Sequence, residues 1–308
     1  MILKKISFVI IILFFSLSAY SLENKILVKV NNTIITSVDI FKETQYLIAI
    51  NKDMKKLSKN KIFDIAKNSL IRKTIKLNEI NKYNNNKSLD DKFTNQLIKS
   101  NAIKLGFNSI NDFQKHLINY GVELKDLKER LSTAVLWNEL ILKKYSNKLR
   151  INKEKIKEEI LLSNKKKLKS YLLSEIVVNL DSGEKIVEKY KIIENEISKT
   201  GFDNAALIYS ISDTSSSGGT LGWIKETSLN KSIKNKILNL KIGQHTKPLI
   251  ISGGFLVLKV KDIKEVNQKL DFKKELQKRI IDKQNQQLNQ FSLMYYNKIK
   301  NDVKIDEL

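Results

Sequence analysis

The chain has 308 residues, no cysteine and a formal net charge of +23. The absence of cysteine excludes disulfides, thiolate metal ligands and a cysteine nucleophile, and the length allows about two domains. The positive charge suggests nucleic-acid binding, but the lysines are spread along the whole chain with no basic patch interleaved with aromatic residues, so we predict no nucleic-acid site.

The first 21 residues have the pattern of a secretory signal peptide. Lys4 and Lys5 precede an apolar run at residues 6–17, and Ala19 and Ser21 are small residues at the positions that a signal peptidase requires. The apolar run is shorter than the about 20 residues that a membrane-spanning helix needs. We therefore predict cleavage near Ser21, with an uncleaved membrane anchor as the alternative.

Residues 22–167 are predicted to form a mainly helical domain. Two short strands at 26–30 and 33–35 precede a helix at 38–50, for which Thr36 or Ser37 is a suitable N-cap. Apolar stripes predict more helices, whose apolar faces must be buried against one another. We expect these helices from 59 to the asparagine-rich linker at 84–86, and then at 89–105, 109–120, 124–148 and 153–166.

Residues 168–264 have the pattern of a small α+β module. A strand at 172–178 and helices at 184–198 and 202–208 precede a glycine-rich turn at 218–222. An apolar pattern from Leu229 to Leu240 has helical spacing. Two β-rich runs at 246–251 and 255–260, joined by Ser-Gly-Gly, predict a hairpin.

Residues 265–308 contain one long amphipathic helix, which Asp271 can cap. At about 1.5 Å per residue it extends for about 45 Å, which is too long for the module alone to cover. We expect its apolar face to pack on the N-terminal helices, and residues 303–305 to pair with the early strand. The module is then an insertion within a discontinuous helical domain.

Five pieces of sequence, in order within residues 168–264, resemble the parvulin (PpiC-type) family of peptidyl-prolyl isomerases. They are the strand at 172–178, Tyr-Ser-Ile-Ser-Asp at 209–213, Gly-Gly-Thr-Leu-Gly-Trp at 218–223, Lys-Ile-Gly-Gln at 241–244, and Gly-Gly-Phe-Leu-Val-Leu-Lys-Val at 253–260. The string Val-Lys-Val-Asn-Asn-Thr-Ile-Ile at 28–35 and the order of the helices resemble SurA-type periplasmic chaperones. The resemblance implies an α+β fold in which a helical N-terminal core, completed by a C-terminal helix, carries an inserted parvulin-like domain with a four-stranded antiparallel sheet.

Both histidines of the parvulin site are replaced in this chain. The resemblance places the first at Glu175 and the second at Phe255, while the family's Cys or Asp position falls at Ser212 or Asp213. The apolar cup for the proline ring falls on two aliphatic residues, Leu229 and Ile233. We predict Asp213 as the catalytic candidate and Leu229, Ile233, Phe255 and Glu175 as substrate-contacting residues, with no metal and no cofactor.

Each of these residues also has a purely structural interpretation. Asp213 precedes Thr214 and Ser215 and is well suited to cap a turn. Leu229 and Ile233 have the i, i+4 spacing of a helix core. Phe255 fits a core position, and Glu175 fits a half-buried strand position paired with a lysine. With the histidines replaced, the resemblance implies the parvulin fold without implying the activity.

Together with the signal-peptide pattern, the resemblance to SurA-type chaperones implies a periplasmic chaperone that binds unfolded outer-membrane proteins without ATP, with the outer-membrane assembly machinery as a further partner. Two alternatives remain open. One is an active peptidyl-prolyl isomerase that uses Asp213 with a nonstandard partner. The other is a membrane-anchored foldase of the PrsA or PpiD kind, whose lipoprotein version is disfavoured because no lipobox cysteine is present.

Overall fold

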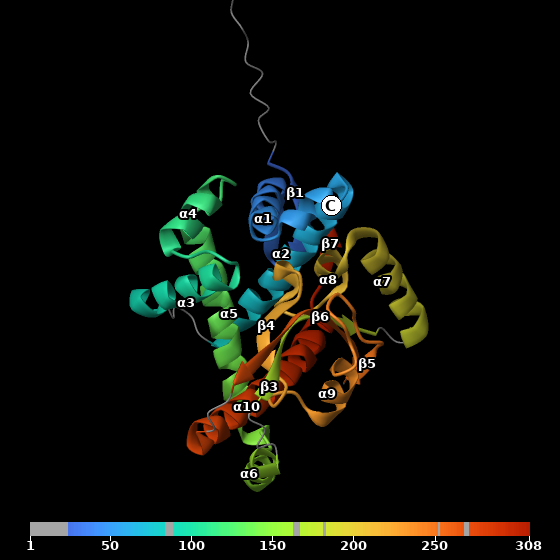
Figure 1. Cartoon of the computed structure of the whole chain (residues 1–308). Coiled ribbons are helices and arrows are strands. Elements are labelled where there is room, and N and C mark those ends of the chain that lie inside the picture. Colours follow the sequence, from blue (N-terminus) through green and yellow to red (C-terminus); the bar gives the residue numbers. More distant parts are fainter. Residues whose placement is uncertain (1–23, 84–88, 163–166, 181–182, 252, 268–270) are drawn as a thin grey trace, which may run out of the picture.

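The computed structural model describes residues 24–83, 89–162, 167–180, 183–251, 253–267 and 271–308. Figure 1 shows two parts. We call residues 24–162 together with 271–308 the helical core, and residues 167–267 the sheet module. The signal peptide predicted at 1–21 lies outside the described residues.

The helical core begins with a short hairpin. β1 (Ile26–Val30) pairs antiparallel with β2 (Thr33–Thr36), and Asn31 at the turn has a φ of 52°, which asparagine tolerates better than most residues. Thr36 caps α1 (Ser37–Ile50): its hydroxyl accepts a hydrogen bond from the Asp39 N–H, and the Asp39 carboxylate accepts one from the Thr36 N–H. This capping box confirms the N-cap predicted at Thr36.

The helices that follow each bury an apolar stripe. α1, α2 and α5 share one cluster, which contains Leu47, Ile75 and Trp137, and a smaller cluster around Phe113 joins α3, α4 and α5. The predicted helix at 153–166 is described only as far as Leu162. The elements are η1 (Lys52–Lys56), α2 (Lys59–Tyr83), α3 (Asp91–Lys104), α4 (Ile110–Ile118), α5 (Leu124–Tyr145), η2 (Ser146–Lys148) and α6 (Lys153–Leu162).

The last helix closes the helical core, as predicted. α10 (Phe272–Asn301) begins at its N-cap Asp271 and packs against α5, α6 and α2. The Trp137 ring of α5 stacks on Tyr295 at 5.8 Å between centroids, and the Trp137 Nε1–H donates to Ser292 Oγ at 2.8 Å. β7 (Ile305–Glu307) then pairs antiparallel with β1, so the predicted terminal pairing forms two residues further along the chain.

The sheet module is built on an antiparallel sheet with strand order β4-β3-β6-β5. One face carries Ile176, Phe255 and Val257, which pack under α7 and α8. The other face carries Leu173 and Leu258 and packs partly against α9. The strands and helices are β3 (Lys167–Asn179), α7 (Ile186–Thr200), α8 (Phe202–Tyr209), η3 (Ser215–Ser217), β4 (Thr220–Lys225), α9 (Lys231–Ile237), β5 (Leu249–Ile251) and β6 (Gly254–Asn267).

Two predictions for the sheet module were too long. The helix expected from Leu229 to Leu240 is reduced to α9, because the Asn230 side chain accepts from the Ile233 N–H and thereby starts the helix after Leu229. The strand expected at 246–251 is reduced to β5, the three residues that pair with β6. Thr246 instead forms two hydrogen bonds with Leu258 of β6: its N–H donates to the Leu258 carbonyl, and its hydroxyl accepts from the Leu258 N–H.

Gly219 brings β4 against the middle of β3. It has a φ of +74°, and its carbonyl accepts from the Glu175 N–H at 2.8 Å. A Cβ at this position would lie 2.0 Å from the Glu175 carbonyl oxygen, which is closer than atoms can approach. Glycine therefore allows the backbone approach that holds Glu175 in place.

Candidate functional site

A cavity of about 1020 Å³ lies between the sheet module and α10. β3, β4, β5, β6 and the segment around α9 form one wall, which is largely apolar, and α10 forms the other wall. Cavities that hold small ligands usually span about 300–1,000 Å³, so this one has room for several residues of a peptide. The apolar wall includes Leu173, Val177, Leu229, Ile233, Leu256 and Leu258.

The alternation of side chains along β3 decides which residues line the cavity. Leu173, Glu175 and Val177 face it, while Ile176 and Val178 point to the opposite face, under α7 and α8. The side chains of β6 alternate in the same way, so that Leu256 and Leu258 face the cavity while Phe255 and Val257 face α7 and α8.

The structure brings three of the predicted substrate-contacting residues together. Glu175, Leu229 and Ile233 all line the cavity, and the two aliphatic residues are partly buried. Phe255 does not reach it, because this side chain is fully buried on the opposite face of the sheet and lies edge-on to the Tyr190 ring. Asp213 is also outside the lining.

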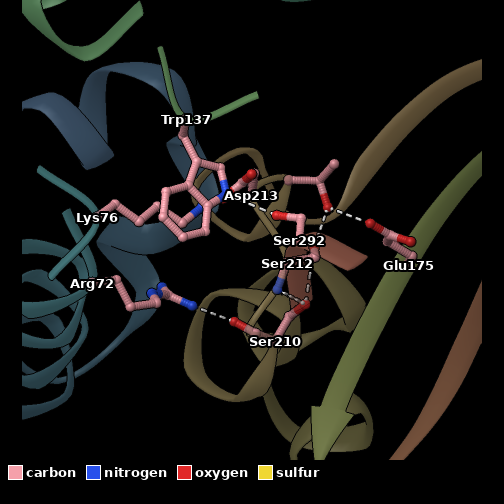
Figure 2. A network of polar contacts seen from close by, with 9 residues as sticks. Arg72, Lys76, Trp137, Glu175, Ser210, Ser212, Asp213 and Ser292 are labelled. Atoms are coloured by element: carbon pink, nitrogen blue, oxygen red, sulfur yellow. Dashed lines mark hydrogen bonds and ion pairs between the residues drawn. The ribbon is translucent and has the colours of Figure 1, made fainter. Parts of the chain in front are cut away.

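A chain of hydroxyl groups runs from the edge of the sheet module to Glu175 (Figure 2). The Ser210 hydroxyl donates to Ser212 Oγ at 3.3 Å, and the hydroxyls of Ser212 and Thr214 lie 2.6 Å apart. The Thr214 hydroxyl donates to Glu175 Oε1 at 2.9 Å. Glu175 thus meets neutral donors here, and not the lysine that we expected as its partner.

Asp213 points away from the cavity, towards the helical core (Figure 2). Its carboxylate forms an ion pair with Lys76 of α2, whose ammonium group also lies 5.1 Å from the centre of the Trp137 ring. One turn earlier on α2, the Arg72 guanidinium donates to the Ser210 carbonyl. The segment that carries the catalytic candidate is therefore a contact between the sheet module and the helical core.

Burial raises the pKa of the Glu175 carboxyl above that of an ordinary glutamate, and the nearby Asp213 charge raises it further, while hydrogen bonds from Thr214 and Ser212 oppose the shift. A raised pKa means that the folded protein keeps this proton to a higher pH than the unfolded chain does. Stability is then lost as the pH rises from the ordinary glutamate pKa through the raised one.

We expect Glu175→Gln to remove this loss, so that the variant gains stability over the wild type as the pH rises through that window. Urea denaturation at a series of pH values measures the free energy of unfolding of both proteins. Glu158→Gln, at an exposed position of α6, is the control and should follow the wild type. Parallel pH profiles for wild type and Glu175→Gln would contradict the expectation.

The comparisons with known proteins agree with this geometry. The family model of the PPIC-type PPIase domain (rotamase) matches residues 173–262, so this part of the chain is a PpiC-type rotamase domain. The protein named Chaperone SurA from Pseudomonas putida is 21% identical over 183 residues, covering 56% of this chain and 43% of that protein. Chaperone SurA from Pseudomonas aeruginosa is 22% identical over 187 residues, covering 56% of this chain and 44% of that protein.

The chain is thus similar to a PpiC-type rotamase domain over residues 173–262 and to these two SurA chaperones over 56% of its length. The chain spans less than half the length of these two relatives. A solved structure described as one of two structurally related SurA-like chaperones of Campylobacter jejuni is 15% identical, covers 92% of this chain and 99% of its own, and has a TM-score of 0.35.

Sequence reasoning missed the second wall of the cavity. α10 contributes seven lining residues, most of them polar, on the side that faces the sheet module. The sequence signal for these lining residues is the run Gln284 to Gln290, in which six of the side chains are amides. The other side of this helix is apolar.

Proposed function

We propose that the protein is a periplasmic chaperone that holds extended apolar segments of unfolded proteins in the cavity between the sheet module and α10. The single observation that carries the proposal is this cavity, with an apolar wall on the sheet and room for several residues. Covering apolar client surface is favourable by about 25 cal/mol per Å². Binding therefore needs no ATP.

The client class and the location are part of the same proposal. The similarity to SurA and the signal-like start support unfolded outer-membrane proteins as clients, and the outer-membrane assembly machinery as a further partner. In the part of the chain that the structure describes, helices are too short or too polar to cross a membrane. Fractionation of cells, with sequencing of the mature N-terminus, tests the location and would reveal an anchored foldase instead.

The domain organisation is also part of the proposal. Residues 22–167 and 265–308 form one chaperone domain, into which the parvulin-like domain at 168–264 is inserted. The hydrogen bonds and ion pair between α2 and residues 210–213 support a fixed contact between the two.

Dilution of unfolded porin into buffer, followed by light scattering, tests the chaperone function. We expect the wild type to suppress aggregation at a stoichiometric ratio. Leu229→Lys with Ile233→Lys should require several-fold more protein, because two charges would stand on the apolar wall. The matched control, Val187→Lys with Ile192→Lys, changes two exposed residues of α7 and should act like the wild type. Absence of suppression by the wild type rejects the proposal.

Prolyl isomerisation is the second candidate function, because Glu175 presents a carboxyl with a raised pKa to the cavity at a family histidine position. A protonated carboxyl can donate a hydrogen bond to a twisted prolyl amide. The ion pair of Asp213 with Lys76 leaves Glu175 as the stronger candidate of the two. A protease-coupled assay on an Xaa-Pro peptide decides, and a rate equal to the uncatalysed one excludes the activity.

A further inference from the structure

Side-chain hydrogen bonds join α10 to the sheet module on both sides of the cavity, and besides a bond from the Thr227 hydroxyl to Glu275 at 3.3 Å there are two more. The Ser228 hydroxyl donates to the Asp282 carboxylate at 2.6 Å, and the Asn297 side-chain amide donates to Asn179 Oδ1 at 3.0 Å. Between these two contacts α10 stands off from the sheet and forms the polar wall of the cavity. Hydrogen bonds therefore hold the wall to the sheet module on either side of the cavity.

Four primary amides occupy the middle of this wall. Within the described parts of the chain, none of the four side chains has a hydrogen-bond partner, although each offers two N–H donors and one carbonyl acceptor. An apolar ligand would bury these groups without partners, at a cost of about 1–3 kcal/mol for each group. The four residues are Asn285, Gln286, Asn289 and Gln290.

The spacing of these amides matches an extended polypeptide. Asn285 and Asn289 lie four residues apart, as do Gln286 and Gln290, which corresponds to about 6 Å along a helix axis. An extended chain presents N–H and C=O groups to the same side every second residue, a repeat of about 6.6 Å. Each pair of amides can therefore reach equivalent backbone groups of alternate residues.

The charged side chains around the cavity favour a particular kind of client segment. Three lysines line it, and the ammonium groups of these lysines form no ion pair with the described residues. Two carboxyl groups, those of Asp282 and Glu175, also line the cavity, so the three lysines outnumber them. The cavity is therefore complementary to acidic groups. The three lysines are Lys225, Lys236 and Lys278.

We propose that the amides of α10 bind the backbone of an extended client segment, whose apolar side chains rest on the sheet wall and whose flanking acidic residues meet the lysines. This inference rests on the proposed chaperone function and deepens it. Because the backbone is the same in every sequence, such a site accepts many clients as long as they are extended. Folded proteins do not bind, because their backbone N–H and C=O groups are already hydrogen-bonded within their own structure.

Fluorescence anisotropy with two labelled peptides tests the inference. The first is a short peptide of alternating valine and threonine with aspartate at both ends. The second has the same sequence with alternate backbone nitrogens methylated, which removes N–H donors without removing apolar surface. We expect the wild type to bind the first peptide about tenfold more tightly than the second, which corresponds to about 1.4 kcal/mol.

The matching protein variant is Asn289→Leu with Gln290→Met, which keeps side-chain size and makes the wall more apolar. We expect it to bind the unmodified peptide about tenfold more weakly than the wild type does, and the methylated peptide no more weakly. A purely hydrophobic cavity would give the opposite sign. The control is Gln277→Met with Asn301→Leu, two exposed positions on the same helix outside the cavity, which should bind like the wild type.

The outcomes distinguish failure of this inference from failure of the proposed chaperone function. If the wild type suppresses porin aggregation but the Asn289→Leu/Gln290→Met variant binds the unmodified peptide as tightly as before, the inference fails and the chaperone function stands. If the wild type neither suppresses aggregation nor binds either peptide, the chaperone function fails. Replacing the terminal aspartates of the peptide by lysines should weaken binding, and equal affinity would remove the role of the three lysines.

Discussion

Trp137→Ala is expected to lower the free energy of unfolding by about 3–5 kcal/mol, the usual cost of emptying a fully buried aromatic site. The Trp137 side chain is completely buried, stacks on Tyr295 of α10, and donates to Ser292 on the same helix. The substitution thus opens a cavity at the joint between α5 and α10. Since domains are stable by only about 5–15 kcal/mol, we expect a large fall in the urea midpoint, measured by circular dichroism.

The second tryptophan provides the control. Trp223 of β4 is 41% exposed, and Lys264 lies over its ring at 3.9 Å. Trp223→Ala should cost clearly less than Trp137→Ala, because the Trp223 ring is already partly exposed and its removal leaves no enclosed cavity. Equal losses for the two variants would show that α10 does not close the helical core.

Gly219→Ala is expected to destabilise the sheet module by about 2–5 kcal/mol. The positive φ of Gly219 costs about 1–2 kcal/mol for any residue with a Cβ, and overpacking against the Glu175 carbonyl adds about 1–3 kcal/mol. The clash is with backbone, so no side chain can rotate to relieve it. Hydrogen exchange of the β3 and β4 amides, together with urea denaturation, measures the effect.

Gly222→Ala isolates the clash from the backbone strain. Gly222 has a similar φ of +85°, but a Cβ there would meet nothing within 4 Å. We expect this variant to lose only the strain energy of about 1–2 kcal/mol. If Gly219→Ala cost no more than Gly222→Ala, the close approach of β4 to β3 would not exist in solution.

The features predicted well are those that neighbouring residues determine. Thr36 and Asp271 are recognisable as N-caps because the groups they bind lie within three residues. The packing of α10 on the helical core also followed from its sequence, because a long apolar stripe must be covered by something. The order of the parvulin-like pieces predicted the four-stranded sheet that the structure contains.

The features predicted poorly depend on residues far apart in the chain. The partner of Asp213 is Lys76, 137 residues earlier, and no local pattern marks such a pair. The position of Phe255 under α7 and α8 follows from strand alternation, but only once the register of β6 against β3 is known. The cavity itself needs both α10 and the sheet, so neither sequence segment indicates it alone.

The pairing of β1 with β7 has a consequence for how the protein is made. Val28 lies opposite Glu307, so this contact can form only after synthesis has passed Glu307. At about 5–20 residues per second, the interval between α6 and the end of α10 is on the order of ten seconds. The sheet module, whose strands all lie between residues 167 and 267, can fold during this interval. The usual order of folding, with the N-terminal part first, is thereby reversed: the inserted sheet module folds first, and the helical core is completed last.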